Sequence, residues 1–248
     1  MKTIYIMWLR ELKRYFRSKS RMIGSLGQPL LFLLALGYGL GSVFQAAGQG
    51  NYFQFLVPGI VGMSIIFTAI FSGIQIIWDR QFGFLKETLV APVSRLNIMI
   101  GRTLGGATVA TLQGMIVFIL AMLFGFRPDN WWLVPVAVVF MLLVALLFTA
   151  LGTGIASVLE DMQGFQLIMN FLVMPLFFLS GALFPLSGLP SILAGLTIID
   201  PLSYGIDSFR ALLVNTTHFG LGVDFTVLVI VTAVFLVVGS YLFSKIEV

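Results

Sequence analysis

Few side chains in this sequence are of types that do chemistry. The 248 residues include no cysteine and a single histidine, His218, and charged residues make up 10% of the chain. Disulfides and thiolate metal sites are therefore excluded, and one histidine provides neither a set of metal ligands nor a base paired with a nucleophile. We expect no catalytic residue and no metal site, with His218 at the outer end of a helix.

One glycine-rich stretch invites comparison with a phosphate-binding loop. Residues 101–108, GRTLGGAT, lack the lysine of the G-x-x-x-x-G-K-[ST] motif that cradles nucleotide phosphates. The stretch lies at the start of an apolar run, and Gly101 and Gly105 have the spacing that lets membrane helices approach closely. We expect close helix packing there, and no nucleotide-binding or enzymatic activity in this chain.

The remaining charged residues include three notable groups. Residues 79–102 carry four basic and two acidic side chains, and they lie between 57 residues (22–78) and 24 residues (103–126) that carry none. Glu160 and Asp161 form an isolated acidic pair, and Asp207 stands three residues before Arg210. The meaning of these groups depends on the elements that position them.

Those elements are predicted to be membrane helices. Hydrophobic residues make up 59% of the chain, above the roughly 45–50% of soluble domains. A helix needs about 20 apolar residues to cross a bilayer, whereas barrel strands would read as segments of about ten residues with alternating polarity. The sequence predicts an all-α membrane protein, one transmembrane domain over residues 1–248, with six spanning helices at 22–44, 53–78, 98–126, 131–158, 163–184 and 222–244.

Lysine and arginine are distributed unequally between the two ends of these helices. Seven precede the first span, four lie within residues 79–102 and Lys245 follows the last span, whereas the other face has only Arg127 and Arg210. By the positive-inside rule both termini and residues 79–102 are expected in the cytoplasm. Glu160 and Asp161 then form a cytoplasmic turn, either simply hydrated or at the inner mouth of a transport path.

Residues 1–21 have the period of an amphipathic helix. At 100° per residue an apolar face and a basic face separate, which is typical of a helix lying in the membrane interface. The alternative is a segment that only supplies charge for topology. The apolar face consists of Met1, Ile4, Tyr5, Trp8, Leu9, Leu12, Tyr15 and Phe16, and the basic face of Lys2, Arg10, Lys13, Arg14 and Arg17.

The segment 79–97 is longer than a simple connection requires. Helix connections in bundles run to about 2–8 residues, yet FGFLKETLVAPVSRL has apolar residues at helical spacing before Pro92. Such a helix has nothing in this chain to pack on, so a partner is expected. The alternatives are a solvated loop or a second interfacial helix.

Residues 186–214 form the second anomaly. The apolar run 186–199 is only 14 residues long, too short to span a bilayer. Irregular backbone at membrane depth is tolerated only where protein or water satisfies it, so we expect two short helices that dip from the outer face and return, with Asp207 and Arg210 paired on one face. The alternative is an ordinary surface loop.

The same region resembles a family signature. Residues 175–213 are similar to the signature of ABC-2 type permeases, the membrane subunits of ABC exporters. That signature has a P-L-x-F-x-S-G-x-x-F-P core, then L-P, then P-L-x-Y-x-x-D-x-x-R. The matching residues are Pro175, Leu176, Phe178, Ser180, Gly181, Phe184, Pro185, Leu189, Pro190, Pro201, Leu202, Tyr204, Asp207 and Arg210.

The segment 79–97 also looks like the cytoplasmic coupling segment of that family. Lys86 and Glu87 depart from the pattern, because many members have the acidic residue directly after the leucine, which implies that a different side faces the partner. The matching residues are Arg80, Gly83, Leu85, Leu89, Pro92 and Ser94. The resemblance implies a coupling helix that seats in a groove of a cytoplasmic ATPase subunit. The expected contact residues are Arg80, Phe82, Gly83, Phe84, Leu85, Lys86, Glu87 and Leu89.

The resemblance implies further partners and a function. Two such permeases, here as a homodimer, would enclose the substrate path in a prokaryotic plasma (inner) membrane, and two copies of a separate ATPase would bind ATP and magnesium. The expected outer hairpin or gate consists of Ser180, Gly181, Phe184, Pro185, Pro190, Pro201, Tyr204, Asp207 and Arg210.

The expected function is ATP-driven export of a hydrophobic or amphiphilic substrate, such as a drug, a lipid or a lipid-linked glycan. No nucleic-acid partner is expected, because the basic residues follow membrane topology. The alternative is an ATP-independent channel or a secondary transporter. A secondary transporter would need ionisable residues near the bilayer midplane, where the predicted spans have none.

Overall fold

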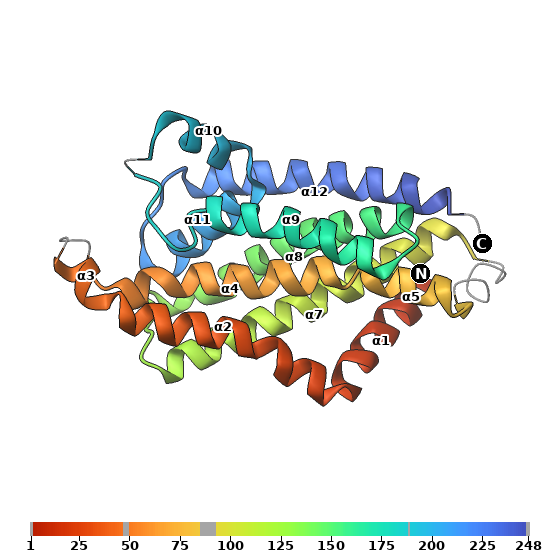
Figure 1. The fold of residues 1–248 in the computed structure, drawn as a ribbon, viewed down its shortest axis with the longest axis horizontal. Coiled ribbons are helices and arrows are strands. Elements are labelled where there is room, and N and C mark those ends of the chain that lie inside the picture. The colour runs from red at the N-terminus through yellow and green to blue at the C-terminus, as the bar shows by residue number, and fades with distance from the viewer. Residues whose placement is uncertain (1, 47–49, 85–92, 188, 247–248) are drawn as a thin grey trace.

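The computed structural model describes residues 2–46, 50–84, 93–187 and 189–246, and in this part of the chain the regular structure is helical throughout (Figure 1). The helices are α1 (Lys2–Arg17), α2 (Lys19–Gly39), α3 (Gly41–Ala46), α4 (Tyr52–Phe71), α5 (Ile74–Gln81), α7 (Arg95–Leu123), the 3-10 helix η1 (Trp131–Leu133), α8 (Val134–Val158), α9 (Met162–Leu179), α10 (Ser191–Ile199), α11 (Pro201–Val214) and α12 (Leu221–Ser244).

Six helical stretches of the described chain are long and apolar enough to cross a membrane, which confirms the predicted number. They cover Met22–Gly39, Tyr52–Gln81, Arg95–Leu123, Trp131–Val158, Met162–Leu179 and Leu221–Ser244. The predicted boundaries differ most at the ends of the first and fifth spans, which end at Gly39 and Leu179, each five residues before the predicted end. After Gly39 the chain turns and continues as α3.

The spanning helices run side by side, and the molecule has two distinct ends (Figure 1). One end has both ends of the chain and α5, and we call it the termini end. The opposite end has α3, α10 and α11, and we call it the hairpin end. The positions expected to couple to a partner and those expected to gate the outer face therefore lie at opposite ends of the bundle.

The core lies where α4, α7 and α8 meet, and most residues along α4 are buried. α11 fills the hairpin end of this core, because the consecutive residues from Leu202 to Arg210 are all buried, which covers every side of the helix. By contrast α2, α9 and α12 expose most of their apolar surface. Such exposed apolar faces are expected of helices that contact lipid or another protein.

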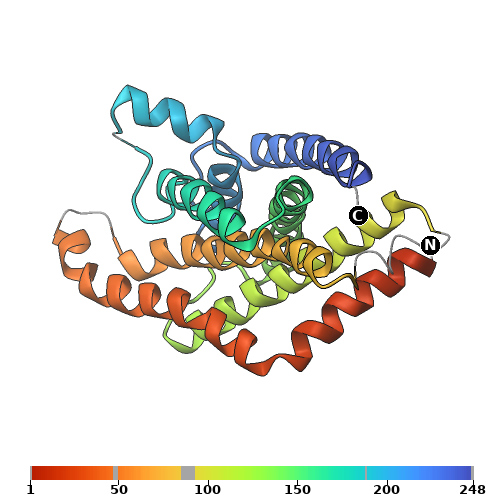
Figure 2. The ribbon, with the colours of Figure 1, turned by 45° about the vertical axis from the view of Figure 1, so that its right-hand side comes forward.

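The N-terminal helix α1 lies across α7 (Figure 2). A Cβ atom added at Gly101 would come within 2.7 Å of the Met7 Cβ, and one at Gly105 within 2.7 Å of the Glu11 Cβ. The predicted close packing at residues 101–108 is therefore confirmed, and its partner is α1. Met7, outside the predicted apolar face, is buried at this crossing.

Candidate functional site

A buried carboxylate organises the termini end. The Asp79 carboxylate, on α5, is 2% exposed and is bonded by Arg102 of α7, which is 4% exposed. Two arginines of α1 also reach it, Arg10 at 3.3 Å and Arg14 at 3.8 Å, and the Gln75 amide donates to it at 3.2 Å. We call these five residues the Asp79 cluster.

The Asp79 cluster ties together α1, α5 and α7. Arg10 and Arg14 were predicted on the basic face of α1, and their side chains are 34% and 28% exposed while their guanidinium groups reach the Asp79 carboxylate. A carboxylate taken out of water requires cations and donors around it, and α1 presents two of its arginines to Asp79 while it packs on α7. A displacement of α1 would therefore change the charges around a buried acid.

Two further arginines fasten the ends of the predicted coupling segment to other helices. Arg80 donates to the backbone carbonyls of Ser157 and Leu159, at 2.9 and 3.1 Å, at the end of α8. Arg95 donates to the carbonyls of Ser244 and Ile246, at 2.6 and 3.1 Å, at the end of α12. Cations at the carboxyl ends of helices satisfy carbonyls left without intrahelical donors and complement the helix dipole.

Aromatic side chains are exposed beside this anchored segment. Phe82 is 60% exposed and Phe84 54% exposed, and the Phe82 ring stacks on Trp78 with centroids 5.1 Å apart. Gly83 between the two phenylalanines has a φ of 78°, which a residue with a side chain adopts only with strain. The other expected contact residues, Leu85, Lys86, Glu87 and Leu89, lie outside the described residues.

The acidic pair of the α8–α9 turn has local bonding roles. The Asp161 carboxylate accepts a bond of 2.5 Å from the Gly164 backbone N–H and so caps the start of α9. The Glu160 carbonyl accepts a bond of 3.2 Å from the Gln81 amide. The turn is thereby attached to the start of the coupling segment.

At the hairpin end a buried arginine holds the chain reversal after α9. Arg210 donates to the Gly181 and Ala182 carbonyls, at 2.6 and 3.3 Å, and its guanidinium lies 3.8 Å from the centroid of the Phe55 ring. Burial lowers the pKa of Arg210 to about 10, an effect that nearby Asp207 opposes, so the side chain stays cationic at neutral pH.

Asp207 and Arg210 were expected to pair with each other, but each has its own partners. The Asp207 carboxylate accepts bonds from the Thr217 hydroxyl and the His218 and Phe219 backbone N–H groups, at 2.7–2.8 Å. Asp207 thus holds the connection between α11 and α12, while Arg210 holds the end of α9. His218 contributes through its backbone.

Other residues of the family-like signature shape the same region. Ser180 ends α9 and its hydroxyl accepts a bond from the Ala182 N–H, Gly181 has a φ of 74°, and Tyr204 donates to the Ile198 carbonyl at 2.8 Å. Pro190 precedes α10 and Pro201 begins α11. Phe184 and Pro185 lie in the connection after α9.

Asp200 separates the two hairpin helices. Its carboxylate accepts a bond of 2.9 Å from the Leu202 N–H and so caps α11. Burial raises the pKa of this carboxyl to about 7, although the bonds from Leu202 and Ser203 act in the opposite direction. The two short helices predicted within residues 186–214 are therefore present, with a polar break between them.

Comparison with known proteins identifies the family. Residues 2–214 match the family described as ABC-2 type transporter. The chain belongs to the ABC-2 type transporter family.

Relatives of this ABC-2 permease extend over most of its length. It is 26% identical to the putative transport permease ycf38 of Cyanophora paradoxa, with 98% of this chain and 88% of that protein covered. It is 29% identical to Nodulation protein J of Rhizobium leguminosarum bv. trifolii (85% and 78% covered) and 28% identical to the inner membrane transport permease YadH of Escherichia coli K12 (92% and 90% covered). This permease is accordingly a membrane transport protein.

Sequence reasoning missed part of the site in this ABC-2 permease. Asp79 and Arg102 were counted only as the limits of a charged stretch, and Asp224, inside the last predicted span, was not considered. Asp224 is 0% exposed, and within the described chain its two carboxylate oxygens have no hydrogen-bond partner. Its place in the first turn of α12, where a helix favours negative charge, was the available signal.

Proposed function

We propose that this permease is the membrane-spanning subunit of an ATP-driven exporter, powered by a separate cytoplasmic ATPase that binds at the termini end. The observation that carries the proposal is the exposed aromatic pair Phe82 and Phe84. The pair lies in the segment whose two ends are bonded to other helices by Arg80 and Arg95. Exposed apolar clusters mark protein contacts, and members of this family generally work with an ATPase subunit. In this arrangement both termini face the cytoplasm and α10 and α11 re-enter from the outer face.

The fastening of the segment explains how ATP hydrolysis would reach the membrane helices. Because Arg80 bonds the end of α8 and Arg95 the end of α12, a displacement between them acts on both helices. The Asp79 cluster adds α1, α5 and α7 to the same end. Two ATPase copies would drive two permeases, and the exposed apolar faces of α2 and α9 provide surface for a homodimer around the substrate path.

The cargo proposed is hydrophobic or amphiphilic. Charged side chains in the described spans lie near the helix ends, as Asp79, Arg102 and Asp224 do, and the middle turns carry no charged side chain. A path lined by such helices suits a drug, a lipid or a lipid-linked glycan better than a small ion. Magnesium and ATP belong to the partner.

Copurification tests the proposed contact. Phe84→Asp should release the ATPase, because an unpaired charge in an apolar contact costs several kcal/mol (roughly 2–7). Trp132→Asp is the matched control, since Trp132 is also an exposed aromatic residue but lies in η1, outside the anchored segment. Stoichiometric copurification of the ATPase with Phe84→Asp would place the contact elsewhere.

Energy dependence separates this proposal from an ATP-independent channel or a secondary transporter. Proteoliposomes that contain the permease and its ATPase should transport amphiphiles only with ATP, and a proton ionophore should leave the rate unchanged. Transport that persists without ATP, or that stops with the ionophore, would reject the proposed exporter.

A further inference from the structure

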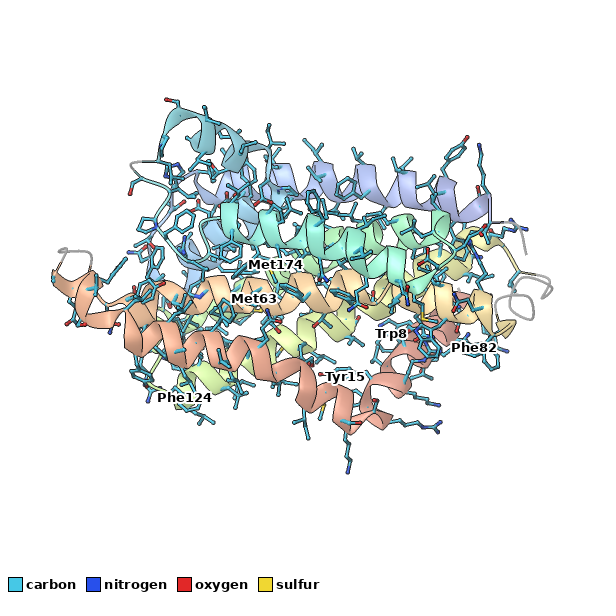
Figure 3. All side chains as sticks on the ribbon, viewed as in Figure 1. Trp8, Tyr15, Met63, Phe82, Phe124 and Met174 are labelled. Atoms are coloured by element: carbon cyan, nitrogen blue, oxygen red, sulfur yellow. The ribbon has the colours of Figure 1, made fainter. Side chains whose placement is uncertain are left out.

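A cavity of about 280 Å³ lies between the α1–α2 elbow and helices α4, α5 and α7. Its lining includes residues of both α1 and α2, and Figure 3 labels Tyr15 and Met63, which line it from α1 and α4. We call it the elbow cavity. It is distinct from the aromatic surface assigned to the ATPase.

A polar stripe of α4 and α5 faces the elbow cavity. Ser64, Thr68, Ser72 and Gln75 all line it, and their spacing of three and four residues places them on one face. Ser64 is 2% exposed, and within the described chain its hydroxyl has no hydrogen-bond partner. A buried hydroxyl without a partner costs free energy, which a ligand oxygen bound at this place would offset.

The charge beside the elbow cavity favours an anion. Arg14 lines it, and the two carboxylates near the Arg14 guanidinium are at long distances, 3.5 Å to Glu11 and 3.8 Å to Asp79. The ion pairs next to the cavity leave one positive charge, because they contain three arginines and two carboxylates. These are Arg10, Arg14 and Arg102, with Glu11 and Asp79. A phosphodiester supplies one negative charge and oxygens that arginine binds well.

The remaining walls are apolar. Pro29, Met63, Phe67, Phe71 and Val109 line the elbow cavity together with the polar stripe. The cavity thus combines hydroxyl and amide groups, a cation with available donors, and apolar surface, which are the groups that an anionic lipid headgroup and the start of its chains require.

We propose that the elbow cavity binds the headgroup of a phosphate-bearing amphiphile. The phosphate lies against Arg14, the hydroxyls or esters of the headgroup meet Ser64, Thr68 and Gln75, and the apolar part leaves along α2 and α4. The inference rests on the proposed function only in that the amphiphile is taken from the cytoplasmic leaflet. It is either a resident lipid or cargo on its way to the substrate path.

Two glycines of α2 provide a matched pair of variants. Gly24 lines the elbow cavity, and a Cβ atom there would meet nothing within 4 Å, so the leucine of Gly24→Leu has room at its Cβ atom and occupies space at the cavity wall. A Cβ atom at Gly27, one turn further along α2, also meets nothing within 4 Å, but Gly27 does not line the cavity. Arg14→Gln removes the cation without filling the space.

The experiment measures binding of dioctanoyl phosphatidylglycerol, with dioctanoylglycerol as the phosphate-free probe, to the purified permease–ATPase complex. Gly24→Leu and Arg14→Gln should each weaken phosphatidylglycerol binding about tenfold, whereas Gly27→Leu stays within about twofold of the original chain. Equal binding by the Gly24→Leu and Gly27→Leu variants, or equal binding of both probes, would overturn the proposal. If the Gly24→Leu variant does not fold, the Arg14→Gln variant still tests the proposal.

Transport by the same variants distinguishes the two sources of the amphiphile. Loss of ATP-driven transport in Gly24→Leu but not in Gly27→Leu identifies cargo, and retained transport identifies a resident lipid; both support the site. If phosphatidylglycerol binding depends on Gly24 but no ATP-driven transport is found, the exporter proposal fails and the site stands. If transport needs ATP but phosphatidylglycerol binding is unchanged in the Gly24→Leu and Arg14→Gln variants, the proposed site is wrong and the exporter proposal stands.

Discussion

Two buried arginines at opposite ends of this permease are held in different ways. Arg102 at the termini end bonds a carboxylate that Arg10 and Arg14 of α1 also approach. Arg210 at the hairpin end bonds two carbonyls and lies over the Phe55 ring. The first arrangement joins three helices through a shared charge, whereas the second joins α11 to the chain reversal after α9 and to α4 through uncharged partners, two carbonyls and a ring. The comparison teaches that one end is built to respond to displacement and the other to keep its geometry.

Removing the shared carboxylate should have the largest effect. Asp79→Ala leaves Arg102 buried beside two other cations, and breaking a buried ion pair costs about 3–5 kcal/mol. The free energy of unfolding in mixed micelles measures this loss. Glu11→Gln is the control, because its pair with Arg14 is 3.5 Å apart and partly exposed and is expected to contribute under about 1 kcal/mol. Equal losses would mean that Asp79 is not the centre of the cluster.

Replacing each arginine by lysine sharpens the contrast. Arg210→Lys loses the planar fork and the ring contact and should cost about 1.5–3 kcal/mol. Arg102→Lys keeps a cation for the Asp79 carboxylate and should cost less. Unfolding of both variants under the same conditions measures the difference, and a larger loss for Arg102→Lys would invert the comparison.

The crossing of α1 on α7 gives a test of intermediate size. Gly101→Ala should destabilise by about 1–3 kcal/mol, because the new methyl group would overlap Met7 and the Ile4 backbone. Gly41→Ala is the control, since nothing lies within 4 Å of a Cβ atom there. Thermal unfolding of the two variants should separate them, and equal midpoints would show that α1 is loosely held.

The smallest effect is expected at the hairpin end. Asp224→Asn replaces a fully buried carboxylate, which has no hydrogen-bond partner in the described chain, by a neutral amide, and this should stabilise the fold by about 0.5–1.5 kcal/mol. The midpoint of unfolding at neutral pH is the measurement. A marked loss of stability would show that the Asp224 carboxylate has a required cationic partner.

The fold was largely predictable because hydropathy acts locally. Each spanning helix is a run of apolar residues that is visible in the sequence. The prolines in and before residues 186–214 likewise indicated two short helices there. The faces of α1 were not predictable in the same way, since a helical period does not distinguish lipid from a neighbouring helix. For that reason the sequence did not predict that Met7 and Arg14 of α1 turn toward the protein.

The candidate site was predictable only where its residues are neighbours in the sequence. The aromatic residues around Gly83 stand next to one another in the sequence, whereas the Asp79 cluster joins residues up to 92 positions apart, Arg10 and Arg102. A single sequence does not reveal such pairing. Asp224 was hidden because one acid at the edge of an apolar run changes its mean hydropathy little.

The bonds of Arg80 and Arg95 to the ends of α8 and α12 have a mechanical consequence. A helix rises about 1.5 Å per residue, so the 25 residues of α8 form a stiff rod of roughly 37 Å that runs from the Arg80 bond to η1. A small tilt at the anchored end becomes a sideways displacement of the far end, where η1 contacts α11. Because Arg80 bonds the end of α8 and Arg95 bonds the end of α12, a displacement of either arginine would act first on the helix that it bonds.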